Sequence, residues 1–251
     1  MNYIETLSDQ IIKNNWSFEH KGKPKLGWQI EYEKIKNPIK STKNAEKHMD
    51  KNRYSNILPY DDNQVQISEY INASWVNGSI VTQWPLENTV EDFWEMICKY
   101  NVVSIIALTK IEREDQCCYW HQYVIDTVVE KDYIIRTLKR SNCTVKHYQY
   151  TAWPDFKCPN VESLLALMNI VDMSTGIKCI HCSAGVGRAG TFMTIEQCLK
   201  QINNKEEVDI NQVISNLREQ RLAMVQTAEQ YAFCYYALVY FLNVSMSVQI
   251  Q

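Results

Sequence analysis

The stretch KCIHCSAGVGRAGTF, residues 178–192, places a cysteine, a glycine-rich turn and an arginine between an apolar segment and a helical one. Residues 179–182 are typical of a short buried strand, and residues 189–203 of a helix. A strand-to-helix turn directs successive backbone N–H groups into one concavity, at the positive end of the helix dipole. Gly185, Gly187 and Gly190 allow positive φ and a close backbone approach. The stretch therefore predicts an anion-binding loop.

Cys182 begins this loop, and Arg188 follows it six residues later. The field at a helix N-terminus favours the thiolate, which is the nucleophilic form of cysteine. A guanidinium offers a planar pair of donors to two oxygens of a tetrahedral anion. A phosphate monoester fits both groups. The alternative is a glycine-rich helix entry with a buried, inert cysteine.

A second stretch, TAWPDFKCP at residues 151–159, supplies Asp155. Expulsion of a tyrosine, whose pKa is about 10, is helped by a general acid, typically by about 10²–10⁴-fold. Trp153, Pro154 and Pro159 predict a stiff, bounded loop that closes as a lid. On its own, Asp155 is better interpreted as a turn residue or a helix N-cap, both common after proline.

Bulk composition excludes several classes of protein. The 251 residues are 45% hydrophobic and 22% charged, with a net charge of −3, which does not favour nucleic-acid binding. No apolar run reaches 18 residues, so we expect no membrane insertion. The N-terminus carries acidic residues where a signal peptide needs a basic region, which predicts a cytoplasmic protein. Nine cysteines, an odd number, do not form a secreted disulfide framework, although Cys179 and Cys182 leave a redox or metal C-x-x-C open.

The order of elements predicts one α/β domain over residues 1–251, with a mixed central sheet flanked by helices. Residues 1–20 and 89–100 have helical spacing, the latter with Thr89 as an N-cap. Residues 102–109 form an apolar run typical of a buried strand. Residues 116–153 alternate in polarity, which indicates an antiparallel meander. The lysine-rich segment 33–53 is either a solvated surface or a basic approach to an anionic substrate.

Taken together, these stretches resemble the classical protein tyrosine phosphatase domain. The signature H-C-x-x-G-x-x-R-[ST]-G is matched by His181, Cys182, Gly185, Arg188 and Gly190. KNRYSNILPYD resembles the phosphotyrosine-recognition loop, HYQYTAWPD the mobile acid loop, and VQTAEQYAFCYYAL the glutamine-bearing segment. YINASWVNG and TQWPLENTVEDFWEMI resemble the core segments that follow the recognition loop. The resemblance implies the phosphatase fold, with a highly twisted sheet.

The resemblance also implies a role for each site residue. Cys182 would form a phosphocysteine, Arg188 would clamp the phosphate, and Asp155 would act as general acid and base. Gln226 would orient the water, with Gln230 beside it, and His181 would belong to the catalytic group. Tyr54 would stack on the substrate ring, Phe156 would close over it, and Asn56 would bind the substrate backbone. The backbone N–H groups of residues 183–188 would hold the phosphoryl oxygens, including those of Ser183, Ala184, Gly185, Val186 and Gly187.

Further expectations follow from the same resemblance. Phosphotyrosine-containing proteins would be the partners, no metal or organic cofactor is implied, and we expect a monomer.

Some residues depart from the family pattern. Ala189 stands where a serine or threonine follows the arginine, so we expect slow breakdown of the phosphoenzyme. Trp84 replaces a glycine, Asp115 stands where a lysine is expected, and Ala223 replaces a glycine at the rim. The resemblance implies that Glu112 or Glu114 is the glutamate that the family places behind its site residues. Such departures resemble viral, bracovirus-like members of the family, which predicts a viral origin.

Three functions compete. The first is a phosphotyrosine-specific phosphatase, and the second is a catalytically weak module that captures phosphotyrosine proteins. A lipid or dual-specificity phosphatase is disfavoured, because SAGVG lacks lysines for a polyphosphorylated ring and Tyr54 implies a deep slot.

Overall fold

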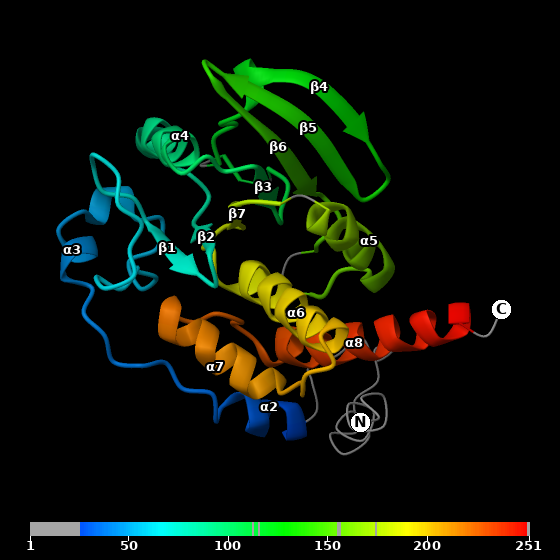
Figure 1. Cartoon of the computed structure of the whole chain (residues 1–251). Helices are drawn as coiled ribbons and strands as arrows, with labels where there is room; N and C mark the ends of the chain where they lie inside the picture. Colours follow the sequence, from blue (N-terminus) through cyan, green and yellow to red (C-terminus); the bar gives the residue numbers. More distant parts are fainter. Residues whose placement is uncertain (1–25, 112, 115, 155–156, 174, 250–251) are drawn as a thin grey trace.

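The computed structural model describes residues 26–249 except 112, 115, 155–156 and 174. Seven strands form one twisted mixed sheet in the order β1-β2-β7-β3-β6-β5-β4 (Figure 1). The strands are β1 (Ala73–Val76), β2 (Ser79–Thr82), β3 (Ser104–Ala107), β4 (Val124–Val129), β5 (Tyr133–Arg140), β6 (Cys143–Tyr150) and β7 (Lys178–His181). The helices are α2 (Leu26–Tyr32), α3 (Lys43–Glu46), α4 (Val90–Lys99), α5 (Val161–Asp172), α6 (Gly187–Asn203), α7 (Ile210–Gln220) and α8 (Ala228–Gln249), with short 3₁₀ turns η1 (Met49–Lys51), η2 (Glu87–Thr89) and η3 (His121–Tyr123).

The centre of the sheet is parallel and both edges are antiparallel. Strands β2, β7, β3 and β6 run parallel, whereas β1 pairs antiparallel with β2, and β4–β5–β6 form the antiparallel meander that the sequence predicts. The fold class is therefore confirmed. Parallel strands end at the same edge of the sheet, so the segments after β2, β3, β6 and β7 meet there.

Successive residues of the central strands face opposite sides of the sheet. On β7, Cys179 packs with α4 on one face, and Ile180 packs with the helices of the other face. The same alternation holds for Ile105 and Ile106 on β3. Because both faces are covered, β3 lies within the largely apolar run at residues 102–109, as buried parallel strands often do.

Helix α6 is the central helix of the larger layer. It contacts α7 and α8, while α5 packs against α8 and β6, and α2 against α8 (Figure 1). The C-terminal helix α8 is 22 residues long. The glycine-rich turn between β7 and α6 thus joins the middle of the sheet to this central helix.

Three further details bear on the sequence predictions. Thr89 occupies the N-cap position of α4, but its side chain makes no capping bond; its Oγ1 accepts from Leu86 N at 2.9 Å instead. The predicted helix at residues 1–20 lies outside the described residues. In the lysine-rich segment, Lys40 pairs with Asp62 at 3.1 Å and Lys51 with Asp92 at 3.0 Å, so carboxylates neutralise these charges locally.

None of the helices in the described part of the chain combines the length and apolar character needed to cross a bilayer. Within the same residues, no three His, Cys, Asp or Glu side chains are grouped so that they could hold a metal ion.

Candidate active site

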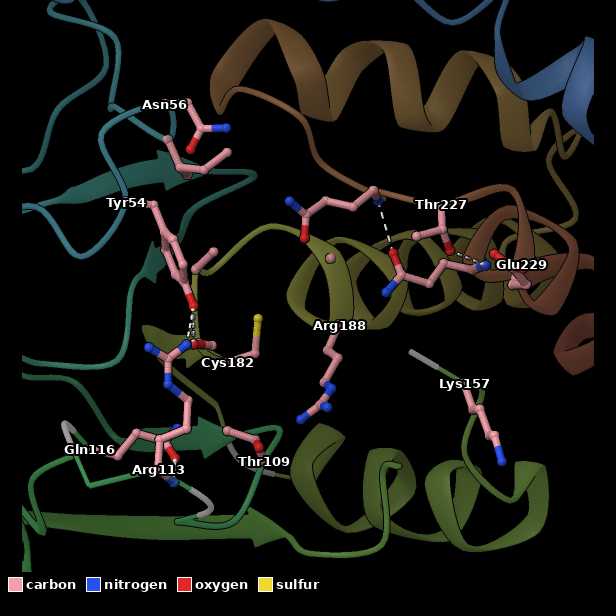
Figure 2. Close-up of a pocket in the computed structure, with 16 residues that line it drawn as sticks. Tyr54, Asn56, Thr109, Arg113, Gln116, Lys157, Cys182, Arg188, Thr227 and Glu229 are labelled. Carbon is pink, nitrogen blue, oxygen red and sulfur yellow. Dashed lines mark hydrogen bonds between the residues drawn. The ribbon is translucent and has the colours of Figure 1, made fainter. Parts of the chain in front are cut away.

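A cleft of about 640 Å³ opens at the carboxyl end of β7 and gathers most of the predicted site residues. Figure 2 shows Cys182 and Arg188 between two walls, with Tyr54 and Arg113 on one side and Thr227 and Glu229 on the other. The predicted residues that line the cleft are Tyr54, Asn56, Cys182, Ser183, Ala184, Gly187, Arg188, Gln226 and Gln230. Gly185, Val186 and His181 are buried behind it.

The loop carbonyls turn away from the cleft toward donors in the surrounding protein. Ser183 O accepts from Trp84 N at 2.9 Å, and Gly185 O accepts from Arg221 Nε at 2.9 Å. Val186 O accepts from Val225 N at 3.0 Å. In a trans peptide the C=O and the following N–H point in opposite directions. The N–H groups that follow these carbonyls, at residues 184, 186 and 187, therefore point to the inner side of the loop.

Gly185 is required by this geometry. Its φ is +71°, and a Cβ at this position would lie 2.0 Å from the backbone oxygen of Thr82. No side chain fits there, because the contact is with backbone rather than with a movable side chain. The sequence predicts a glycine where two backbone segments approach closely, and at Gly185 the loop approaches the end of β2 in this way.

Arg221 supports the loop from below and was not identified from the sequence. It is fully buried and donates to Gly185 O at 2.9 Å, Asn72 Oδ1 at 2.8 Å and Ser74 Oγ at 3.0 Å. Burial lowers the pKa of its guanidinium to about 10, still above neutral pH, so the charge is retained. An arginine at a helix end has no local signal of burial, since its partners lie more than 30 residues away in sequence.

Tyr54 is held at the cleft wall by two hydrogen bonds. Arg113 Nη1 donates to its hydroxyl at 3.0 Å, and the hydroxyl lies 2.9 Å from Ser183 Oγ. Because arginine can only donate, the Tyr54 hydroxyl accepts from Arg113, and either hydroxyl can be the donor in the bond between Tyr54 and Ser183. Tyr54 is thus fixed to the loop between β7 and α6.

Cations outnumber carboxylates at the cleft. Among the described lining residues, Arg113, Lys157 and Arg188 are cationic, and Glu229 is the carboxylate that faces them. Arg113 and Lys157 add to the charge that the sequence assigned to Arg188 alone. A dianionic ligand is therefore favoured.

The segment that carries Gln226 is held in a strained backbone conformation. Ala223 and Val225 have φ of 59° and 61°, which is unusual for a non-glycine residue and more so for a β-branched one. Val225 O accepts from Tyr32 Oη at 3.0 Å and from Arg218 Nη2 at 2.9 Å, which holds the strain. Gln226 N donates to Gln230 Oε1 at 2.9 Å. Gly187 gives both amides room, since a Cβ there would lie 2.8 Å from Gln226 Oε1.

His181 is enclosed by aromatic rings directly behind Cys182. Its ring lies 5.2 Å from that of Trp84, edge to face, and its Nε2 is 2.6 Å from Tyr119 Oη. Trp84 is itself fully buried, and its Nε1 donates to Cys117 O at 3.0 Å. The tryptophan that departs from the family pattern thus packs behind the loop and does not line the cleft.

The buried histidines make stability depend on pH. Burial lowers the pKa of His181 from 6.5 to about 4, and it lowers the pKa of His147 well below its usual value. Between pH 6.5 and about pH 4, His181 binds a proton in the unfolded chain but not in the folded chain. Stability is therefore complete above pH 6.5 and is lost as the pH falls toward 4. From His181 alone we expect a loss of about 2 kcal/mol between pH 7.5 and pH 5.

Urea unfolding at the two pH values measures this loss. The variant His147→Phe should flatten the dependence, and the exposed His121→Gln should leave it unchanged. A pH dependence that is the same in His147→Phe and in the wild type would contradict the assignment.

Asp155 and Phe156 lie outside the described residues. Their neighbours on either side are placed: Trp153 is buried, its Nε1 donates to Lys157 O at 3.0 Å, and Lys157 lines the cleft. Glu112 and Asp115 also lie outside the described residues. The proposed roles of all four stay predictions.

Cys179 and Cys182 do not behave as a C-x-x-C pair. Cys179 is buried against α4, and Cys182 packs with the opposite layer. Both are free thiols, and burial raises the pKa of Cys179 well above its usual value. This placement does not favour the redox interpretation that the sequence left open.

Residues 48–240 match the protein-tyrosine phosphatase family, and the chain belongs to this family. Human receptor-type tyrosine-protein phosphatase alpha is 35% identical over 80% of this chain and 31% of that protein. The eta receptor-type enzyme of Gallus gallus is 35% identical over 82% of this chain and 18% of that protein. Mouse tyrosine-protein phosphatase non-receptor type 20 is 34% identical over 76% and 54% of the two chains. The chain thus spans about half or less of the length of each of these three relatives. The viral origin expected from the sequence stays a prediction.

Proposed function

We propose that the chain hydrolyses phosphotyrosine in proteins through a phosphocysteine intermediate. The observation that carries the proposal is the loop between β7 and α6. Residues of this loop line the cleft together with Cys182 and Arg188, and Tyr54 forms the adjacent wall. A phosphoserine is too short to bring its phosphate to Cys182 past such a wall.

The chemistry divides among the residues as follows. The Cys182 thiolate attacks phosphorus, the P–O bond to tyrosine breaks, and Asp155 gives its proton to the leaving phenoxide. Loop amides and Arg188 stabilise the equatorial oxygens during transfer. Gln226 then orients a water that Asp155 deprotonates, and hydrolysis of the S–P bond releases phosphate and the thiolate. Asn56, at the exposed edge of the cleft, fixes the substrate backbone, and Phe156 covers the ring.

Ala189 supports a second candidate, a module that binds phosphotyrosine proteins and turns them over poorly. It is fully buried at the start of α6 and has no hydroxyl to assist the departure of sulfur. Both candidates take phosphotyrosine proteins as partners, and we propose a monomer that acts in the cytoplasm.

Rapid-mixing kinetics separate the two candidates. With a phosphotyrosine peptide, we expect a burst of one equivalent of dephosphorylated product and then slower turnover, because breakdown of the phosphoenzyme limits the rate. Ala189→Ser should raise the steady-state rate by about 10-fold, as expected for one hydrogen bond to a developing charge. Ala166→Ser, which makes the same change at an exposed position of α5, is the control. Binding without a burst would favour the capture module, and a burst-free rate limited by the first step would contradict slow breakdown.

A further inference from the structure

A chain of hydrogen bonds links Arg136 on β5 to the anion-binding loop. Arg136 Nη1 lies 3.3 Å from His147 Nδ1, and His147 Nε2 lies 3.0 Å from Tyr119 Oη. Tyr119 Oη lies 2.6 Å from His181 Nε2, and His181 Nδ1 lies 3.4 Å from Cys182 O. The chain thus passes from β5 through β6 and the segment before η3 to the end of β7.

The donor at one end decides the direction of every bond. A guanidinium carries hydrogens on all its nitrogens and can only donate. His147 therefore accepts at Nδ1, and since it is neutral, its proton is on Nε2 and is donated to Tyr119. The Tyr119 hydroxyl, which keeps its proton because burial raises its pKa, then donates to His181 Nε2.

We propose that Arg136 is a positioning residue that fixes His181 as the Nδ1–H tautomer, with that hydrogen facing the carbonyl of Cys182. The proposal rests on the proposed function of Cys182 as nucleophile, and it adds a residue 46 positions away from Cys182 in sequence (182 minus 136) to that site.

Without Arg136 the chain can run in the opposite direction. His147 can then carry its proton on Nδ1, and Tyr119 can donate to His147 while it accepts from His181 Nε2–H. The lone pair of His181 Nδ1 would face the carbonyl oxygen of Cys182, and two acceptors would repel. The positive end of the imidazole dipole beside the nucleophile would be replaced by the negative end, which disfavours a thiolate.

The guanidinium of Arg136 is itself held in place. Its Nη1 also donates to Gln149 Oε1 at 2.9 Å, which its second hydrogen on that nitrogen allows. Its carbon lies 5.1 Å from the centroid of the Trp120 ring, and that ring lies 4.8 Å from the ring of His147. Gln149 Nε2 donates in turn to Thr109 O at 3.1 Å, so the donor at the head of the chain is fixed from three sides.

The tautomer is read directly from the wild-type enzyme. With ¹⁵N-labelled histidine, the ring nitrogens of His181 should show a protonated Nδ1 and an unprotonated Nε2, and His147 the reverse. An Nε2–H signal for His181 would overturn the proposal, and this result needs no variant.

Substitution then tests whether Arg136 is the cause. Arg136→Met keeps the stem on Trp120 and removes the donors, so we expect the Nδ1–H signal of His181 to weaken. The rate of Cys182 alkylation by iodoacetate at pH 6 should fall about fivefold, the loss expected from one hydrogen bond. Arg140→Met is the matched control. Arg140 lies on the same strand, over the rings of Trp94 and Tyr123, and makes no hydrogen bond to His147, Tyr119 or His181. Equal effects of the two substitutions would overturn the proposal.

A double variant tests the route. In a His147→Phe background, Arg136→Met should have no further effect on the alkylation rate, because the link is already broken. A second fivefold fall there would show that Arg136 acts by another route and would overturn the proposal. Neither readout requires turnover, so a wild-type enzyme that has the predicted tautomer but hydrolyses no phosphotyrosine would contradict the proposed function alone.

Discussion

Cys182→Ser should lower kcat for a phosphotyrosine peptide by roughly 10⁵–10⁶-fold, the loss usual for removal of a nucleophile. A serine hydroxyl is not ionised at neutral pH and does not gain enough from the loop to become so. The N–H groups of the loop and Arg188 remain, so binding of the peptide should persist. Steady-state kinetics and calorimetric titration of the same preparation measure both quantities.

Cys179→Ser is the matched control, because it makes the same chemical change three residues away on the opposite face of the sheet. It should retain kcat within about threefold of the wild type, provided that the buried hydroxyl is tolerated. If Cys179→Ser lost as much turnover as Cys182→Ser without loss of stability, the redox pair would return as an explanation. Retained turnover in Cys182→Ser would contradict the phosphocysteine mechanism.

Gly185→Ala should lower the free energy of unfolding by roughly 3–5 kcal/mol and reduce kcat/KM by more than about 10²-fold. The added methyl group would meet the Thr82 carbonyl oxygen at 2.0 Å, so either β2 or the loop must move. The loop is held by Arg221 and Trp84, and displacement of its N–H groups by even 1 Å misaligns them with the phosphoryl oxygens. Denaturant unfolding and peptide kinetics report the two effects.

Gly78→Ala separates the steric contribution from the backbone contribution. Gly78 also has positive φ, at +77°, but a Cβ there meets nothing within 4 Å. Gly78→Ala should lower the free energy of unfolding by only about 1–2 kcal/mol, the cost of an alanine in the left-handed conformation, and leave kcat/KM unchanged. Equal losses at the two positions would contradict the close approach between the loop and β2.

The local features of the site were predictable because they depend on neighbours in sequence. The strand, turn and helix around Cys182 and the need for glycine at 185 follow from a single stretch of about 15 residues, 178–192. The alternation along β4, β5 and β6 predicted the meander for the same reason. Polarity alone could not order the sheet, since β7 enters between β2 and β3 from a distant part of the chain.

The supports of the loop were not predictable in this way. Arg221 and Arg136 resemble the surface arginines of an ordinary helix and strand. The burial of Arg221 and the partial burial of Arg136 depend on partners that only the fold brings together. The family pattern points to the acidic residues Glu112, Glu114 and Asp115, and it gives no signal for Arg113, which lies among them in the sequence. Trp84 departs from the family pattern in sequence, and only the fold reveals that its ring packs behind the loop and its backbone N–H donates to Ser183 O.

The central claim is that Cys182 takes the phosphoryl group while the loop and Arg188 hold it. Acid quenching within milliseconds of mixing with a ³²P-phosphotyrosine peptide, followed by peptide mapping, tests it directly. The account predicts one equivalent of acid-stable radioactivity on the peptide that contains Cys182, and more of it at steady state than in Ala189→Ser. Release of phosphate with no label on that peptide would contradict the account.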